Sequence, residues 1–308
     1  MSDVSRTTNG NPWGRVGFNE TVRKIISERI VLVSALEYET QLLKPIGSGF
    51  VLAANDETAV CVTAAHVLTT AVRLSLHPNQ VRLPNPFVPE ISESAYENAR
   101  KSGRLLFTLF FEGNAGVAAA VDGFWSIDDA DICVVALKLA RSPTQPLKRI
   151  GINSDGLNTG AELIAVAPIE HSCRLSDPLD PKTFEVIAEI QPRIGSITEF
   201  HVKDRILKCP VYETSIPFVG GMSGGPVFLG PQAGSEPTRI ALVGIVSKDL
   251  SSDEAHGNPE FAGSSTVIPI ALAYKLQMTA NGRRIGFKEL LILLGIDDFG
   301  VGDQKNIE

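Results

Sequence analysis

The sequence predicts an all-β protein, a sandwich or barrel with a few helices added. Short runs rich in Val, Ile and Phe recur along the chain, and Gly, Pro, Asn and Asp separate them, as in strands joined by turns. Few stretches between these runs have the period of an amphipathic helix, so alternating βαβ units are not favoured. The chain has 27 Gly and 19 Pro among 308 residues, enough for many turns but too few for a linker.

The predicted strands follow these apolar runs in chain order. They cover residues 30–36, 50–54, 60–65, 105–111, 132–139, 162–167, 183–190, 194–199, 206–211, 226–229, 240–247 and 265–268. Helices are predicted over residues 20–29, 89–101, 270–278 and 287–294. Asn19 is a favoured N-cap for the first of these helices, and Gly103 follows the second, where glycine commonly ends a helix.

Charge and hydropathy exclude several classes of partner. The chain has 28 Lys and Arg against 35 Asp and Glu, a net charge of −7, and no basic block, so we expect no nucleic-acid binding. Its longest aliphatic stretch, residues 290–294, is far shorter than the roughly 20 residues that cross a bilayer. Residues 1–10 are polar and lack the apolar centre of a signal peptide. We therefore expect a cytoplasmic protein with no membrane association.

The cysteines are expected to be free thiols. Cys61, Cys133, Cys173 and Cys209 are too far apart in sequence to form a C-x-x-C pair or a zinc-binding pattern. Cys61 and Cys133 lie within apolar runs, where cysteine usually acts as a small hydrophobic residue. This usage fits a reducing compartment, and it implies no metal site.

Three short segments contain a histidine, an aspartate and a serine in settings that nucleophilic catalysis needs. Residues 47–51 (GSGFV) precede residues 62–67 (VTAAHV), which contain His66. Asp131 begins an apolar run, and Ser223 stands within the sequence GGMSGGPV. A serine hydroxyl is a weak nucleophile at neutral pH, so it needs an imidazole to accept its proton and a carboxylate to orient that imidazole. The sequence supplies all three groups.

The glycines around Ser223 suit the binding of an oxyanion. A tetrahedral intermediate needs two backbone N–H groups that converge on its oxygen without a side chain in the way. Gly221 and Ser223 are placed to supply these donors, which makes them the candidate oxyanion hole. Gly224 and Gly225 allow the backbone to turn sharply after the serine.

Together, these segments resemble the His, Asp and Ser boxes of the trypsin/chymotrypsin-like serine peptidases. The patterns T-A-A-H, D-I-x-V and G-x-S-G-G-P are highly specific in combination, and the resemblance covers roughly residues 30–274. The Deg/HtrA-type or intracellular branch, without a PDZ domain, is the closer likeness. The resemblance implies that His66 is the general base, Asp131 the orienting carboxylate and Ser223 the nucleophile, with Gly221 and Ser223 as the oxyanion hole.

The chain departs from the digestive members of that family at two places. Met222 stands where those enzymes carry an aspartate that pairs with a freshly cut N-terminus, so activation by that ion pair is not expected. The dipeptide Ile30-Val31 after Arg29 therefore resembles an activation site only superficially. No cysteine follows His66, so the disulfide beside the base is also missing.

The nucleophile elbow of the α/β-hydrolases is a competing interpretation of the pattern around Ser223. That elbow requires a helix directly after the serine and a catalytic histidine later in the chain. Residues 224–228 are poor helix formers, and the only later histidine, His256, lies in a polar segment. The elbow is therefore not favoured.

Other aspartates and histidines compete with this pair. Asp131 is favoured as the acid because it directly adjoins the apolar strand, and Asp129 is the reserve. The remaining histidines show no partner spacing and are expected to be structural or solvated. These alternatives are Asp122, Asp128 and Asp129 for the acid, and His77, His171, His201 and His256 for the base.

The resemblance implies two antiparallel six-stranded β-barrels with peripheral helices and a cleft between them. The first barrel would carry His66 and Asp131, and the second would carry Ser223. A helical insertion in the first barrel would rim the cleft. The expected segments are an N-terminal helical extension (1–29), the first barrel (30–145) with its insertion (78–104), the second barrel (146–275) and a C-terminal helix with an acidic tail (276–308).

The implied activity is that of a serine endopeptidase, which hydrolyses peptide bonds through an acyl-enzyme on Ser223 and needs no metal or organic cofactor. The expected partners are a polypeptide substrate and, as a candidate, a regulatory protein. The residues that the resemblance places around the substrate's P1 side chain are mostly apolar, which favours small or apolar P1 residues. Asp249 would admit a basic P1 residue if its side chain points inward. By resemblance, the substrate-binding residues are Pro217, Phe218, Val246, Ser247, Lys248, Asp249, Thr266 and Ile268.

Two rival functions remain open at this point. One is an inactive or partner-activated peptide-binding module, in which the oxyanion loop stays collapsed until a partner binds. The other is an esterase on the same scaffold, which would cleave activated esters but not amides. Fluorophosphonate labelling of the wild type and of Ser223→Ala, followed by peptide cleavage, separates the three.

Overall fold

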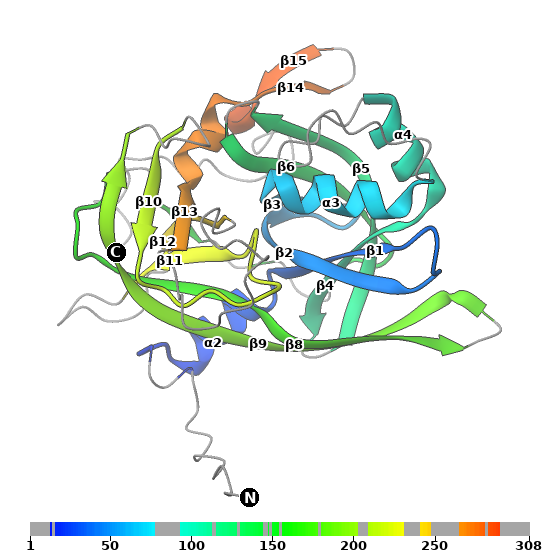
Figure 1. The fold of residues 1–308 in the computed structure, drawn as a ribbon, viewed down its shortest axis with the longest axis horizontal. Coiled ribbons are helices and arrows are strands. Elements are labelled where there is room, and N and C mark those ends of the chain that lie inside the picture. The colour runs from blue at the N-terminus through cyan, green and yellow to red at the C-terminus, as the bar shows by residue number, and fades with distance from the viewer. Residues whose placement is uncertain are drawn as a thin grey trace, which may run out of the picture.

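Two β-barrels lie side by side in the computed structural model (Figure 1). The structure describes residues 13, 16–77, 93–112, 115–127, 130–143, 147, 150–153, 156–177, 180–202, 209–230, 241–247, 265–280 and 283–289. Strands dominate these ranges, as the recurring apolar runs predicted. The all-β prediction is confirmed.

The first barrel is a closed ring of six antiparallel strands. In chain order these are β1 (Ile30–Leu36), β2 (Leu43–Ala54), β3 (Thr58–Thr63), β4 (Leu105–Glu112), β5 (Ala115–Ile127) and β6 (Ala130–Leu139). Around the barrel they follow the order β1-β2-β3-β6-β5-β4, and β1 pairs with β4 to close the ring.

The second barrel is also a ring of six antiparallel strands. It contains β8 (Glu162–Asp177), β9 (Asp180–His201), β10 (Val211–Thr214), β11 (Pro226–Leu229), β12 (Ala241–Val246) and β13 (Ser265–Pro269). The order is β11-β8-β9-β10-β13-β12, and the pairing of β11 with β12 closes it. A short strand, β7 (Gly151–Ile152), adds to β12 in parallel. The two-barrel architecture implied by the family resemblance is therefore confirmed.

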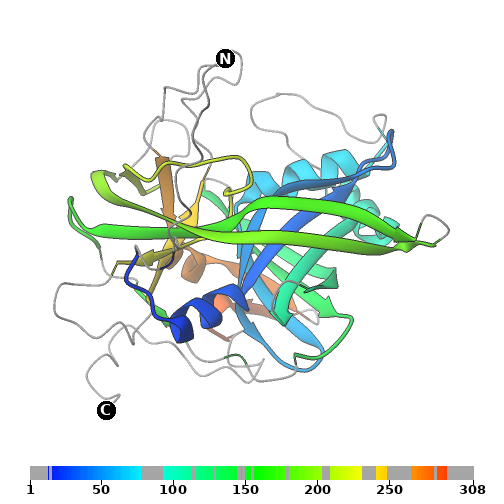
Figure 2. The ribbon, with the colours of Figure 1, turned by 90° about the horizontal axis from the view of Figure 1, so that it is seen from below.

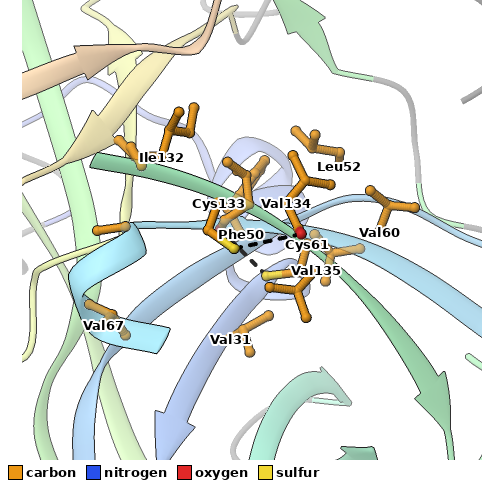
Figure 3. Packing of buried hydrophobic residues seen from close by; sticks show 14 of the residues in the cluster. Val31, Phe50, Leu52, Val60, Cys61, Val67, Ile132, Cys133, Val134 and Val135 are labelled. Atoms are coloured by element: carbon orange, nitrogen blue, oxygen red, sulfur yellow. Dashed lines mark hydrogen bonds between the residues drawn. The ribbon is translucent and has the colours of Figure 1, made fainter. Parts of the chain in front are cut away.

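The larger core cluster fills the first barrel and reaches into the second. Figure 3 shows part of it, where the side chains of Val31, Phe50, Val60 and Val134 meet around two thiols. Burial of this apolar surface is the main term that stabilises the barrel, at about 25 cal/mol per Å² removed from water. A smaller cluster, which includes Leu163 and Val267, fills the second barrel.

The β8–β9 hairpin joins the two barrels by extending past its own. It runs along the lower edge of the first barrel in Figure 1 and crosses in front of that barrel in Figure 2, which is seen from below. There β8 contacts β1 and β2, and β9 contacts β5. Val186 and Ala188 of β9 form a separate apolar cluster with Leu32 and Phe110 of the first barrel. This hairpin fixes the outer wall of the first barrel against the second.

The two strands predicted over 183–190 and 194–199 form one long strand, β9. Pro192 lies between the two predicted strands, and proline cannot donate a hydrogen bond to a ladder. In the structure Pro192 pairs with Val166 of β8, while β10 pairs only with the last part of β9, from Ile197 to His201. The edge of β9 at Pro192 therefore lies beyond the ladder with β10, and the missing donor is tolerated there.

The helices differ from the prediction in several respects. The predicted first helix is present as α2 (Glu20–Ser27), and the Asn19 side chain accepts a hydrogen bond from the Val22 N–H at 2.9 Å. Helix α4 (Glu93–Ser102) lies in the predicted insertion, of which residues 78–92 lie outside the described ranges. Helix α3 (Ala65–Ser75) was not expected; its N-cap is Ala64, whose side chain makes no capping hydrogen bond.

The predicted helix over 270–278 is wrong. A 3₁₀ helix covers Ile270–Lys275, and the chain then enters β14 (Gln277–Ala280), which forms a hairpin with β15 (Arg283–Gly286). The other helix predicted here, over 287–294, begins at residue 287 after β15, but most of its predicted span lies outside the described ranges. In the described part of the chain, every helix is too short or too polar to cross a membrane.

Candidate active site

The predicted base and acid form a hydrogen-bonded pair in the first barrel. His66 is the second residue of α3, which follows β3, and Asp131 is the second residue of β6, the strand beside β3. The His66 Nδ1 lies 2.7 Å from Asp131 Oδ2. The backbone N–H of His66 donates to the other carboxylate oxygen, Oδ1, at 2.9 Å. The carboxylate thus binds both the imidazole and the amino end of α3, where the helix dipole favours negative charge.

The environment of Asp131 favours its ionised form. Burial alone would raise the pKa of the Asp131 carboxyl, because only 8% of the side chain is exposed. The charge of His66, its hydrogen bonds and a hydrogen bond from Ser247 outweigh that cost and hold the pKa of Asp131 below its ordinary value. An ionised carboxylate only accepts hydrogen bonds, so His66 carries its proton on Nδ1. Its Nε2 is then left to accept a proton.

A serine from the second barrel completes this pair. Ser247 directly follows β12 and is buried, and its hydroxyl donates to Asp131 Oδ2 at 2.5 Å. Its backbone N–H donates to the carbonyl of Thr266 at 2.9 Å, which fixes the residue against β13. The acid therefore receives hydrogen bonds from both barrels.

The nucleophile loop, named for the role predicted for Ser223, comprises residues 217–225 of the connection between β10 and β11. Gly221 has φ +91° and Gly224 has φ +81°, a backbone region that disfavours other residues. A Cβ atom on Gly224 would lie 2.2 Å from the Ser48 carbonyl oxygen and 2.3 Å from Thr63 Oγ1. Glycine at 224 is therefore required both by conformation and by the close approach of the first barrel.

The nucleophile loop packs directly beside the segment that carries His66. The carbonyl oxygen of Ser223 accepts a hydrogen bond from the Ser48 N–H at 2.7 Å. A Cβ on Gly47 would lie within 2.8 Å of both that oxygen and the side chain of Val67, the neighbour of His66. Among the hydrogen bonds of the described ranges, none joins the Ser223 hydroxyl to the His66 imidazole. In unliganded enzymes this bond commonly tightens only when substrate binds.

Two predicted departures from digestive peptidases have structural counterparts. Met222 is fully buried, and its sulfur accepts a hydrogen bond from the Val219 N–H at 3.4 Å, so an apolar side chain occupies this position. Arg29 is buried, with its guanidinium donating to the carbonyls of Val51 and Leu52 at 2.9 and 3.0 Å. Its burial makes cleavage before β1 sterically unfavourable, in line with the view that this is no activation site.

The predicted substrate-binding residues do not all lie on one accessible surface. Pro217 is exposed, and Phe218 and Thr266 are half-buried. Val246 and Ile268 are buried in the two core clusters. Ser247 has its hydroxyl on Asp131, as described above. Lys248 and Asp249 lie outside the described ranges.

The backbone of Val246 is also occupied. Its N–H donates to Gly225 and its carbonyl accepts from Gly224, at 2.8 and 2.7 Å. A substrate strand could therefore pair with this segment only beyond Val246. The assignment of these substrate-binding residues stays a prediction.

The competing residues do not join this cluster. Asp122 is exposed on β5, and Asp128 and Asp129 lie outside the described ranges. His77 stacks edge-on against Tyr38, with ring centroids 5.0 Å apart. Neither the side chain of His171 nor any part of His256 is described. Of the candidate acids in the described ranges, only Asp131 hydrogen-bonds the candidate base.

One group within the described ranges has the donor atoms for a metal ion. Glu199 and Glu213 face each other across β9 and β10, and His201 lies diagonal to Glu213. The His201 Nε2 lies 3.0 Å from Glu213 Oε2, and its Nδ1 lies 3.8 Å from Glu199 Oε1. These side chains are partly or fully exposed and belong to the wall of the second barrel, not to the His66 cluster.

Sequence reasoning missed two contacts of the site. Ser247 was expected only to touch substrate, and its bond to Asp131 was not foreseen. Ser48 was noted only as part of the GSG motif, yet its hydroxyl donates to the Gly221 carbonyl at 2.5 Å. The available signal was the pair of glycines that flank Ser48, since glycine in a strand often marks a close backbone approach.

Comparison with known proteins adds likeness of shape. No family model and no curated protein matches the chain. Among solved structures, Deg5 matches at 14% identity and TM-score 0.47, over 84% of this chain and 94% of that chain. An inactive form of the Rv3671c protease matches at 14% and TM-score 0.41, over 80% and 85% of the two chains. A mutant inactive form of Rv3671c from M. tuberculosis H37Rv matches at 14% and 0.45, over 85% and 90%.

Likenesses at this level carry no argument about chemistry. The closed rings and their strand order are the chain's own and do not depend on these matches. The chain thus has the two-barrel fold of the trypsin/chymotrypsin-like serine peptidases, which the sequence motifs predicted. Any conclusion about activity rests on its own residues.

Proposed function

We propose that this protein is a serine endopeptidase. The observation that carries the proposal is the seam between the barrels, where the hydrogen-bonded pair of His66 and Asp131 stands beside the loop of Ser223. A buried, ionised carboxylate that orients an imidazole has little purpose in a purely structural seam, because burying a charge is costly. A base whose Nε2 makes no hydrogen bond within the described ranges, next to a half-buried loop serine, suits nucleophilic catalysis.

The proposed reaction begins when Ser223 Oγ attacks the carbonyl carbon of a peptide bond and transfers its proton to His66 Nε2. The imidazolium that forms is stabilised by Asp131, and the N–H groups of Gly221 and Ser223 bind the oxyanion. His66 then protonates the leaving amine, which departs and leaves an acyl-enzyme on Ser223. Water, activated by His66, attacks the acyl-enzyme ester and releases the carboxylic acid product, which restores the free Ser223 hydroxyl.

The proposed substrate is a polypeptide with a small or apolar P1 residue. Phe218 and Val219 lie directly before the glycines of the nucleophile loop, and Val219 is 40% exposed. An exposed apolar residue beside the candidate oxyanion hole favours apolar contacts with substrate. We further propose a cytoplasmic location, since the three cysteines whose side chains the structure describes are free thiols. We also propose that a regulatory protein acts through the insertion.

The test is cleavage of a peptide library, read by mass spectrometry, with the wild type, Ser223→Ala and Ser215→Ala. Ser215 is an exposed serine of the same barrel and serves as the matched control. We expect the wild type and Ser215→Ala to cleave and Ser223→Ala to be inert. Cleavage of activated esters without cleavage of amides would establish the esterase instead. A wild type that cleaves neither amides nor esters and is not labelled by a fluorophosphonate would support the inactive binding module.

A further inference from the structure

We propose that Ser48 is a positioning residue that holds the oxyanion hole in its working conformation, in place of a charged anchor. This inference rests on the proposed function, and it assigns a role to a residue of the first barrel that touches neither the imidazole nor the attacking oxygen. Its basis is a set of contacts from one buried serine to the nucleophile loop of the other barrel.

Three atoms of Ser48 are engaged at once. Its hydroxyl donates to the Gly221 carbonyl at 2.5 Å, and its N–H donates to the Ser223 carbonyl at 2.7 Å. Its own carbonyl accepts from the hydroxyl of Thr63 at 2.6 Å, which ties it to β3. Ser48 is fully buried in β2, so these bonds form in a low-dielectric setting where hydrogen bonds are strong.

The contact to Gly221 controls a peptide plane. The Gly221 carbonyl and the Met222 N–H belong to one planar unit, and that N–H donates to the Val219 carbonyl at 3.2 Å. Ser48 and Val219 therefore hold the two ends of this plane. Gly221 has no Cβ, so without these bonds its backbone could rotate freely at low cost. The Gly221 N–H belongs to the preceding peptide plane, on the other side of the Gly221 Cα. Rotation at that Cα would change its direction relative to the Ser223 N–H, and the two donors would not converge as the proposed oxyanion hole requires.

The loop has no charged group that could do the same. Residues 217–226 (PFVGGMSGGP) contain no ionisable side chain, and Met222 stands where the digestive enzymes carry an acid. Met222 instead packs in the core of the second barrel, with its sulfur on the Val219 N–H. A neutral hydroxyl from the first barrel thus replaces the ion pair, and the loop needs no cleaved N-terminus to become ordered. We infer that the peptidase is ordered for activity as synthesised.

The first experiment measures kcat and KM of Ser48→Ala on a peptide substrate. Removing a whole oxyanion donor costs about 10²–10³ in kcat, so loosening one donor is expected to cost about 10–10². KM should change less than about twofold, and affinity for a peptide boronate, which forms a tetrahedral adduct, should fall with kcat. Ser34→Ala is the matched control, because Ser34 is a buried serine of β1 whose hydroxyl has no hydrogen-bond partner within the described ranges. Its kinetics should equal those of the wild type.

The second experiment does not depend on activity. Amide hydrogen exchange of the segment 219–225 should be faster in Ser48→Ala than in the wild type and in Ser34→Ala, because the loop opens more often. Unchanged exchange and unchanged kcat in Ser48→Ala would overturn the proposal. A lower thermal stability of Ser48→Ala with unchanged kcat would also overturn the proposal, since that pattern describes a purely structural role. If the wild type were inert but exchange rose as expected, the ordering role would stand and the proposed function would fail.

Discussion

The two halves of the site, one from each barrel, are held in place by different means. The half from the first barrel is charged: the carboxylate of Asp131 binds His66 through its ring and its backbone N–H. The half from the second barrel is a loop of neutral residues, fixed by backbone hydrogen bonds and by glycines that allow close approach. Charge orients the proposed base, whereas shape and backbone bonds orient the proposed nucleophile.

Each half is nevertheless completed by a serine of the other barrel. Ser247 donates from the second barrel to Asp131, and Ser48 donates from the first barrel to Gly221. Neither barrel alone therefore forms the proposed site. Perturbing one half should therefore give a different signature from perturbing the other, and the predictions below use this difference.

The largest effect is expected where the two halves meet. Ser223→Ala and His66→Ala should each lower kcat by about 10⁶, because each removes a group that acts as a unit with the other. The double variant should lose little more than either single one. Steady-state kinetics on a peptide substrate measure this, and additive losses would show that the two residues act independently.

The next effect concerns the charged half alone. Asp131→Asn should lower kcat by about 10⁴, since an amide cannot fix the productive tautomer of His66. The N–H groups of the nucleophile loop are untouched, so affinity for a neutral product-like peptide should remain. A variant that kept more than a tenth of wild-type kcat would remove Asp131 from the mechanism.

Asp131 also makes a prediction about stability against pH. Its folded pKa lies below its ordinary value of 3.8, so the unfolded state binds more protons in acid and folding is stabilised above that value. This stabilisation should be lost as the pH falls below about 4 and through the lowered pKa. Urea unfolding of wild type and Asp131→Asn across pH 2–7 tests it. Equal pH dependence of the two proteins would contradict the account.

A smaller effect is expected at the serine that the second barrel lends to the acid. Ser247→Ala removes one of the hydrogen bonds that keep the pKa of Asp131 low, so that pKa should rise towards its ordinary value. A hydrogen bond to a charged group contributes about 1.5–3 kcal/mol. We expect a part of this energy to be lost in the transition state, which lowers kcat roughly tenfold. The acid limit of stability should also move to higher pH. Steady-state kinetics measures the fall in kcat, and urea unfolding at several pH values measures the pH at which stability is lost. If that pH were the same as in the wild type, Ser247 would not be lowering the pKa of Asp131.

The smallest effect is expected at the thiols of the first barrel. Burial raises the pKa of the Cys133 thiol to about 12 and raises that of Cys61 as well, so neither forms a reactive thiolate at neutral pH. Both thiols point to backbone carbonyls within the apolar core (Figure 3). Iodoacetamide should modify neither residue in the folded protein and both after unfolding, as peptide mass spectrometry would show. Native alkylation at either would mean that this barrel opens readily.

The residues that meet at the candidate site could be chosen from the sequence because they lie in short, specific patterns. His66, Asp131 and Ser223 each stand in a local motif, and strand periodicity placed two of them near strand ends. The contacts of Ser48 and Ser247 could not be predicted in the same way. They join residues 173 and 116 positions apart, so they depend on how the two barrels dock.

The secondary structure was missed where a local signal was weak. Helix α3 has Ala64 as its N-cap and lacks a side-chain capping bond, so the sequence around His66 has the pattern of a strand end. The segment after Ile270 has helical periodicity but a proline before it, and tertiary pairing of β14 with β15 ends the helix early. In both places packing decided the structure and propensity did not.

The most direct measurement is the mapping of a fluorophosphonate adduct by peptide mass spectrometry. Such a reagent phosphonylates a serine only when a neighbouring base activates it and an oxyanion hole receives its oxygen. We predict stoichiometric labelling of the wild type at Ser223 alone, and none in His66→Ala. Labelling of another residue, or labelling that persists without the imidazole, would contradict the claim that the two barrels bring base and nucleophile together.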